Sequence, residues 1–391
     1  MKQLLEPTIQ DKISRQLRTQ RMAVVLFFVV QGMVFASWAS RIPQIQEFHQ
    51  LGDGAWGSVL FSLPVGLLCG LPLSGWSIAR FGSRPTLLTA ALVHICLLPC
   101  IPLAPQVWQL MVILFFYGLS GNLLNIAVNT QAVSVEALYG RSIMSSFHGM
   151  WSLSAFTAAA VGALMISLDV IPFYHFCGMS VALILLTFYT RNKLLSDEKT
   201  ATEKKKLFVM PDRGLLTLGL VAFCGMMCEG TMFDWSGIYF SKVVQPPEDL
   251  LALGYVAFMA AMAGARFVGD KIAFHLGNRR TIQLNGLLIA SGLLISVIFP
   301  QMLTVILGFI LVGFGVSTVV PLVYGMSAKS KTMPAGMALT AVSSIGFMGF
   351  LFGPPLIGYI SELSNLRWSF GLVALLGLGV SILIRQVDMK K

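Results

Sequence analysis

The sequence predicts an all-α integral membrane protein whose twelve transmembrane helices form two six-helix, pseudo-symmetric halves. Three observations carry this prediction: an apolar composition, twelve apolar runs of membrane-spanning length, and one long polar segment in the middle of the chain. Of the 391 residues, 56% are hydrophobic and only 11% are charged, and the mean hydropathy is +0.78. Soluble domains carry roughly 25% charged residues, so the chain is expected to fold in a lipid bilayer.

Each of the twelve apolar runs is long enough to cross the hydrocarbon as a helix, which takes about 20 residues. The runs are continuous, whereas the strands of a membrane barrel alternate over about ten residues. The first run has full span length and no small-residue cleavage site, so we expect a retained helix and not a signal peptide. The expected spans are 22–42, 56–79, 86–104, 107–135, 145–168, 172–190, 214–236, 252–274, 281–299, 303–327, 336–361 and 367–385.

The distribution of Lys and Arg predicts the orientation. With a cytoplasmic amino terminus, the cytoplasmic segments hold 22 of the 27 basic residues, and only Arg41, Lys242 and Arg367 fall on the other side. The positive-inside rule then places both termini in the cytoplasm, and we expect the bacterial inner membrane. The net charge of +10 is therefore a topology signal and does not indicate nucleic-acid binding.

The polar stretch at residues 190–214 divides the chain into two sets of six spans. Weak internal matches support two related halves: "ARFGSRPT" (79–86) matches "FHLGNRRT" (274–281), and "VFASWAS" (34–40) matches "TMFDWSG" (231–237). Related halves with a binding site between them are typical of transporters. The expected organisation is an N-terminal tail (1–21), a six-helix bundle (22–190), a linker (191–213), a second bundle (214–385) and a short tail (386–391).

The segment "GWSIARFGSRPTLL" (75–88) resembles the loop between the second and third helices of the major facilitator superfamily. Gly75, Arg80, Gly82 and Arg84 fit that pattern, whereas Ala79 replaces the usual acid. The resemblance covers the whole chain and implies the major facilitator fold, with a cavity lined by helices 1, 4, 7 and 10. Four segments, "SWASRIPQI", "SFHGMWSLSAF", "EGTMFDW" and "GFLFGPPLIGYI", also resemble uncharacterised bacterial inner-membrane permeases related to the fucose permease branch.

Two carboxylates, Glu229 and Asp234, interrupt the apolar seventh span. A charge at the bilayer centre costs about 2.5 to 3.5 kcal/mol even on lenient insertion scales, so each must be paired, protonated or hydrated. The functional interpretation makes both proton-coupling groups of a cavity, with Glu229 also contacting substrate; a static bond to helix 1 is the alternative. Arg41 is expected to pair with Asp234 as an outer gate, and snorkelling to the interface is the alternative left open.

Amide side chains follow one face of the fourth span. Asn122, Asn125 and Asn129, with Gly118, recur at intervals of four, three and four residues. Amides offer donors and acceptors without charge, which suits a polyhydroxylated or heterocyclic ligand; hydrogen bonding between helices is the alternative.

Three residues of the first and seventh spans are further candidate substrate contacts. Gln31 offers a polar group in the middle of the first span, and Trp38 lies two turns further along the same face. Trp235 corresponds to Trp38 in the internal repeat.

Charged residues near the cytoplasmic ends of spans are candidate gating residues. His148 begins the fifth span and would relay protons or cap the inner gate, although a packed histidine is an equal alternative. Arg266 and Asp270 are one helical turn apart in the eighth span, which favours an inner-gate charge cluster over a substrate site. Arg80 and Arg84 of the loop motif complete this set.

The chain contains no phosphate loop, metal-ligand spacing or nucleophile motif, so we expect neither an enzyme nor an ATP-driven pump, and no cofactor or metal. The sequence predicts a monomeric secondary active transporter that imports a small polar solute, sugar-like or nucleoside-like, together with protons. Its partners would be the solute, protons and the lipid bilayer, with no nucleic acid. A proton-driven exporter of amphipathic drugs and a non-transporting membrane sensor on the same scaffold are the alternatives.

Overall fold

The computed structural model describes residues 7–140, 143–196, 212–330 and 332–387, with the side chains at 7–14, 145, 270, 335 and 336 left out. Over these residues the chain is built from helices. They are α1 (Pro7–Ser40), α2 (Ile42–Phe48), α3 (Asp53–Phe81), α4 (Ser83–Leu97), η1 (Leu98–Leu103), α5 (Val107–Tyr139), α6 (Met144–Ser167), α7 (Pro172–Thr190), η2 (Arg191–Lys193), α8 (Arg213–Tyr239), η3 (Phe240–Val244), η4 (Glu248–Leu250), α9 (Leu253–Leu276), α10 (Asn278–Ile298), α11 (Met302–Val316), α12 (Val319–Ser327), α13 (Ala335–Leu363) and α14 (Leu366–Gln386).

The twelve expected spans are confirmed, because twelve stretches of the described helices are long and apolar enough to cross a membrane. Prolines shape two of them. The third span ends in the 3-10 helix η1, which contains Pro99 and Pro102. The tenth span breaks between α11 and α12 at Ser317 and Thr318, because Pro321 has no amide hydrogen for the Ser317 carbonyl and its ring crowds that carbonyl.

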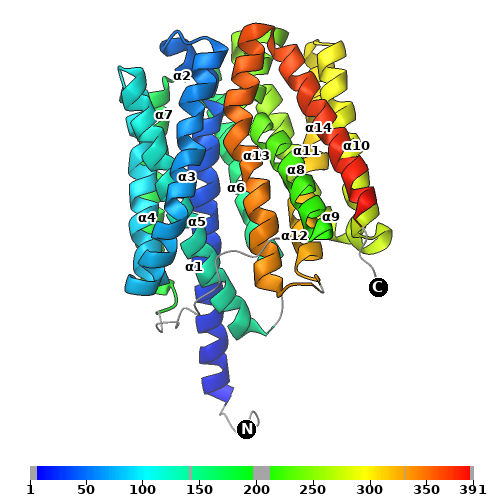
Figure 1. Cartoon of the computed structure of the whole chain (residues 1–391). Helices are drawn as coiled ribbons and strands as arrows, with labels where there is room; N and C mark the ends of the chain where they lie inside the picture. Colours follow the sequence, from blue (N-terminus) through cyan, green and yellow to red (C-terminus); the bar gives the residue numbers. More distant parts are fainter. Residues whose placement is uncertain (1–6, 141–142, 197–211, 331, 388–391) are drawn as a thin grey trace.

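The helices form two halves that stand side by side, α1–α7 and α8–α14 (Figure 1). The halves meet where α3 packs against α13 and where α6 packs against α9. Both termini lie at the lower end of the bundle in Figure 1, which we call the termini end; we call the opposite end the clasp end. This is the twelve-helix, two-half architecture that the sequence predicts.

Large apolar side chains cover the outside of the bundle. Leu185, Leu303 and Leu375 are 66%, 68% and 60% exposed. A water-soluble surface would not tolerate so many exposed apolar groups, whereas lipid tails solvate them. The exposed surface therefore fits a bilayer.

Candidate functional site

A cavity of about 380 Å³ lies between the two halves. Its lining reaches from Asp234 on α8 to His148 near the start of α6, at the termini end. Polar and charged side chains from both halves face it, within walls that are otherwise mostly aromatic and apolar. The lining includes Phe28, Gln31, Phe35, His94, Tyr117, Asn125, His148, Trp151, Met226, Glu229, Phe233, Asp234, Arg266, Phe347 and Phe350.

An ion pair forms one wall of the cavity. Glu229 is 8% exposed, and its Oε1 accepts a hydrogen bond from Nη2 of Arg266 at 3.2 Å. Nη1 of Arg266 donates to the Ser152 hydroxyl at 2.7 Å, and the guanidinium carbon lies 5.4 Å from the centre of the Trp151 ring. Because Ser152 and Trp151 are on α6, Arg266 connects a carboxylate of one half to the other half.

Arg266 lines the cavity, whereas the side chain of Asp270, its expected partner in an inner-gate cluster, lies outside the described residues, so that cluster stays a prediction. The static alternative for Glu229 named helix 1 as the partner; its partner is Arg266 on α9. A sequence does not give the depth or rotation of an apolar helix closely enough to say which residues Arg266 and Glu229 contact.

Asp234 lies on the same wall, on the clasp side of Glu229. Among the described residues it has no hydrogen-bond or ion-pair partner, and the expected pairing with Arg41 is wrong in this conformation. Arg41 is fully buried: its Nε donates to His175 Nδ1 at 3.2 Å and its Nη2 donates to the Val170 carbonyl at 2.9 Å. Gln44 accepts from Nη1. Arg41 therefore ties α1 to α7 within one half, which also rules out snorkelling in this state.

The amides of α5 divide between two roles. Asn125 lines the cavity, whereas Asn122 is buried and accepts a hydrogen bond from Ser74 of α3 at 2.8 Å. The two positions differ by about 60° around the helix axis, which turns Asn122 toward α3. Asn129 Nδ2 donates to the carbonyl and the side-chain oxygen of Asn125, at 2.8 and 2.9 Å. The cavity interpretation thus fits Asn125, with Asn129 orienting it, and the helix-bonding alternative fits Asn122.

The first-span candidates also divide. Gln31 lines the cavity, and its Oε1 is enclosed without a hydrogen-bond partner among the described residues. Trp38 and Trp235 are buried in the apolar core and do not line the cavity, so their expected substrate contact is wrong in this conformation. Helices that are apolar on every face carry no signal of which face meets the cavity.

The remaining gating candidates lie toward the termini end. His148 is exposed to the cavity, with its ring edge-on to Phe28 at 5.3 Å between centres. Arg84 donates to Asn192 at 3.5 Å within the same half, and Arg80 is exposed at the end of α3. Their roles in gating stay predictions.

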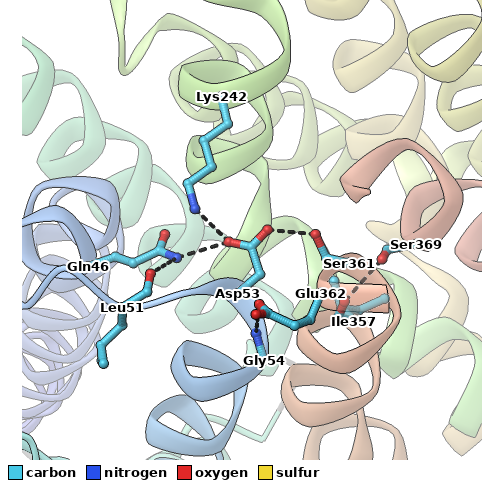
Figure 2. Close-up of polar contacts among 9 residues, drawn as sticks. All are labelled: Gln46, Leu51, Asp53, Gly54, Lys242, Ile357, Ser361, Glu362 and Ser369. Atoms are coloured by element: carbon cyan, nitrogen blue, oxygen red, sulfur yellow. Dashed lines mark hydrogen bonds and ion pairs between the residues drawn. The ribbon is translucent and has the colours of Figure 1, made fainter. Parts of the chain in front are cut away.

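At the clasp end, Asp53 joins the two halves (Figure 2). Its Oδ1 accepts hydrogen bonds from Lys242 Nζ at 2.6 Å and from Gln46 Nε2 at 3.0 Å, and its Oδ2 accepts from the Ser361 hydroxyl at 2.6 Å. Asp53 begins α3 in one half, whereas Lys242 follows α8 and Ser361 ends α13 in the other. One carboxylate therefore holds two helices of the opposite half.

Further contacts reinforce this junction. The amide of Gly54 donates to Glu362 Oε2 at 3.2 Å, and the hydroxyls of Ser58 and Tyr359 are 2.8 Å apart. We call Asp53, Lys242, Ser361 and Glu362 the clasp. The sequence analysis missed it, because acids and bases in short loops are common at membrane interfaces and their pairing depends on how the halves pack.

The described fold and cavity define a helical membrane transporter with two related halves. The sequence-family model of the Major Facilitator Superfamily matches residues 22–332, so the chain belongs to this superfamily of secondary transporters. An uncharacterised MFS-type transporter of Yersinia pestis is 32% identical over 98% of each chain.

Solved structures share the fold. A structure of the nucleoside transporter NupG matches with a TM-score of 0.79 at 10% identity, covering 94% of this chain and all of that one. A bacterial homologue of the human lysosomal transporter Spinster, in an inward-facing and unoccupied conformation, matches with a TM-score of 0.74 at 11% identity, covering 96% of each chain.

Proposed function

We propose that this protein imports a small polar solute together with protons, by alternating access of the central cavity to the two sides of the membrane. The observation that carries the proposal is the Glu229–Arg266 pair in the cavity wall. A carboxylate enclosed by apolar helices is by default a candidate proton-binding group. Here its partner, Arg266, also donates to Ser152 of the opposite half. Its protonation therefore bears on how the halves interact.

The pair also gives a physical reason for coupling. When Glu229 takes a proton, Arg266 loses its charged partner, and an uncompensated buried charge is strongly destabilising. Within the described part of the chain, the Ser152 hydroxyl then satisfies one Arg266 donor, and Nε already lacks a partner. A solute oxygen that replaces the carboxylate would stabilise Arg266. Proton binding and solute binding then favour each other, as coupled transport requires.

Polar groups across the cavity support a polar solute. Gln31 and Asn125 face the site from the half opposite Glu229, and Asp234 offers a second acidic group with no partner in the described part of the chain. Aromatic rings of Phe35, Phe233 and others surround these groups. Few polar groups within an apolar wall suit a ligand with hydroxyl or ring nitrogen groups and a flat face, which is sugar-like or nucleoside-like.

The distribution of basic residues supports a cytoplasmic location for the termini end. The clasp end then faces the periplasm and is closed, while the cavity extends toward the cytoplasmic side. The inward-facing Spinster homologue is similar in fold. Import under a proton gradient would load Glu229 or Asp234 when the clasp is open and release both proton and solute from the state described above.

Purified protein in proteoliposomes tests this proposal. A thermal-shift panel of nucleosides and monosaccharides first supplies a labelled substrate. Glu229→Gln should then abolish uphill accumulation under a proton gradient and retain counterflow exchange, because the amide mimics the protonated acid. Glu47→Gln, at an exposed position on α2, is the matched control and should leave both unchanged. Full gradient-driven uptake by Glu229→Gln would contradict the proposal.

The aromatic walls favour a second candidate, a proton-driven exporter of amphipathic compounds. Phe28, Phe347 and Phe350 add to the apolar surface of the cavity. For an exporter, stabilisation in the thermal-shift panel should come from amphipathic cations and dyes, and the protein should lower their accumulation in cells. Stabilisation by nucleosides or sugars alone would reject this candidate.

A further inference from the structure

A histidine that the sequence analysis did not single out contributes to the cavity wall. His94 on α4 is 4% exposed, and its ring lies against Tyr117 with 4.1 Å between centres. Nδ1 is 3.1 Å from the hydroxyl oxygen of Ser120. Tyr117 is fixed in turn, since its hydroxyl donates to the Val34 carbonyl at 3.0 Å. The imidazole is thus held by the Tyr117 ring on one face and by Ser120 at Nδ1.

Counting protons assigns the tautomer. The Ser120 hydroxyl has a single hydrogen to donate. Its oxygen lies 3.1 Å from the carbonyl oxygen of Tyr117, which can only accept. Both contacts of Ser120 exist together only when its hydrogen goes to that carbonyl and Nδ1–H of His94 donates to the Ser120 oxygen. The reverse arrangement loses one hydrogen bond in a buried place. Nε2 of the neutral ring then carries a lone pair and no hydrogen.

The second ring nitrogen is open to the cavity. His94 lines the cavity, and Nε2 has no partner among the described residues and is not one of the fully enclosed polar atoms. Gly121, another lining residue, makes the space beside the ring: a Cβ there would lie 3.1 Å from Cε1 and 3.7 Å from Nε2. The glycine leaves this edge of the imidazole reachable from the cavity.

We propose that His94 Nε2 is a preset hydrogen-bond acceptor for the transported solute, and that it selects solutes offering a hydroxyl or ring N–H at that point. This inference rests on the proposed transport function and narrows its substrate class. While the ring stays neutral, Nε2 cannot become a donor without breaking the Ser120–Tyr117 bond. A solute whose donor is methylated therefore leaves Nε2 unpaired, and a site built around one hydrogen bond rejects such an analogue.

The tautomer can be measured without any ligand. Nitrogen-15 NMR of the histidine side chains in detergent-solubilised protein distinguishes a protonated ring nitrogen from one with a lone pair, and His94→Gln assigns the signal. We expect hydrogen on Nδ1 and a bare Nε2. Ser120→Ala should move the hydrogen to Nε2 in part or in full. A wild-type ring with hydrogen on Nε2, alone or on both nitrogens, would overturn the proposal.

Matched variants then test selection. A Gln amide reaches about as far as Nε2, whereas an Asn amide reaches only about as far as Nδ1. The probes are uridine with 3-methyluridine, inosine with 1-methylinosine, and glucose with its singly O-methylated derivatives, assayed by thermal shift and by direct binding.

For a probe that binds wild type, methylation at one donor should weaken binding about five- to tenfold, the size of one hydrogen bond. His94→Gln should keep most of this discrimination, and His94→Asn should remove it. Equal discrimination in both variants would reject His94 as the acceptor. Absence of binding by every probe would count against the proposed substrate class, while the NMR result still decides the state of His94.

Discussion

The two ends of the bundle are held together in different ways. Among the described residues, four hydrogen bonds join the halves at the clasp end: Asp53 with Lys242 and with Ser361, Gly54 with Glu362, and Ser58 with Tyr359. Further toward the termini end, the described hydrogen bond between the halves is that of Arg266 with Ser152. The clasp end is therefore the closed end, and its contacts are those that must break for the cavity to open there.

The clasp is also backed by a close backbone crossing of α3 and α13. Gly57 of α3 and Gly358 of α13 touch through their backbones. Charged and hydroxyl groups can exchange their partners for water when the halves separate, so the clasp is suited to repeated opening. The Glu229–Arg266 pair is more enclosed than the Lys242–Asp53 pair, so water is a poorer substitute for either partner there.

The largest expected effect is at the cavity. Arg266→Leu leaves Glu229 enclosed without a partner, and breaking a buried pair in this way costs about 3 to 5 kcal/mol. We expect a clear fall in the thermal unfolding temperature in detergent at neutral pH. The double variant Arg266→Leu with Glu229→Gln should recover much of it. Arg213→Leu, at an exposed arginine, is the control, and a similar fall there would remove the special status of Arg266.

A second effect is expected at the backbone crossing of the clasp end. A Cβ on Gly358 would lie 2.4 Å from the Asp53 carbonyl and 3.0 Å from Gly57 Cα, both backbone atoms that cannot turn aside. Gly358→Ala should disfavour the closed clasp by about 1 to 3 kcal/mol.

Spin labels at Gln50 and Glu248, one in each half, report the separation of the clasp end. The distance distribution should gain a longer component in Gly358→Ala. Gly371→Ala, where a Cβ meets nothing within 4 Å, should leave it unchanged. An unaltered distribution in both variants would mean that the crossing does not hold the clasp closed.

The smallest expected effect is the loss of stability when a helix-capping side chain is removed at either end of the bundle. At the termini end, Asp212 caps α8 by accepting from the Leu215 amide at 2.7 Å, and at the clasp end Asn365 caps α14 by accepting from the Trp368 amide at 3.3 Å. Replacing either by Ala should lower stability by about 1 kcal/mol.

Only the Asp212 effect should depend on pH. The Leu215 amide and then the Thr332 hydroxyl hold the pKa of Asp212 below its ordinary value. A lowered folded-state pKa stabilises the protein above the unfolded value of about 3.9, and this contribution is lost as pH falls through the folded pKa. Thermal melts from pH 7 to pH 3 should show the Asp212→Ala deficit shrinking at the acid end and the Asn365→Ala deficit staying constant. Parallel behaviour of the two would contradict the assignment.

The sequence predicted the spans because the bilayer demands long apolar helices, a requirement that each segment meets on its own. It also placed Gln31, Asn125, Glu229 and Asp234 in the cavity, since polar groups in apolar spans have few other uses. Pairings between distant segments were not accessible in this way. Lys242 and Asp53 are 189 positions apart, and their contact depends on how the two halves meet.

Helix rotation was the other source of error. Trp38, Trp235 and Asn122 lie on helices whose every face is apolar, toward lipid or toward protein, so periodicity does not distinguish the cavity face. His94 was missed because a single histidine in an apolar run is most often a packed residue. Its proposed acceptor role depends on contacts with Ser120 and Gly121, which lie on another helix.

The central claim is that the cavity is open toward the termini end and closed by the clasp at the other end. Asn125→Cys, in protein whose six native cysteines are replaced, places a thiol in the cavity. A membrane-impermeant thiol reagent should label it rapidly in inside-out membrane vesicles and slowly in right-side-out vesicles. Adding Asp53→Asn should raise the right-side-out rate about five- to tenfold, because Lys242 and Ser361 lose their charged partner. The control Asp169→Asn should not. Equal labelling from both sides in the clasped protein, or labelling from the right-side-out surface alone, would contradict the account.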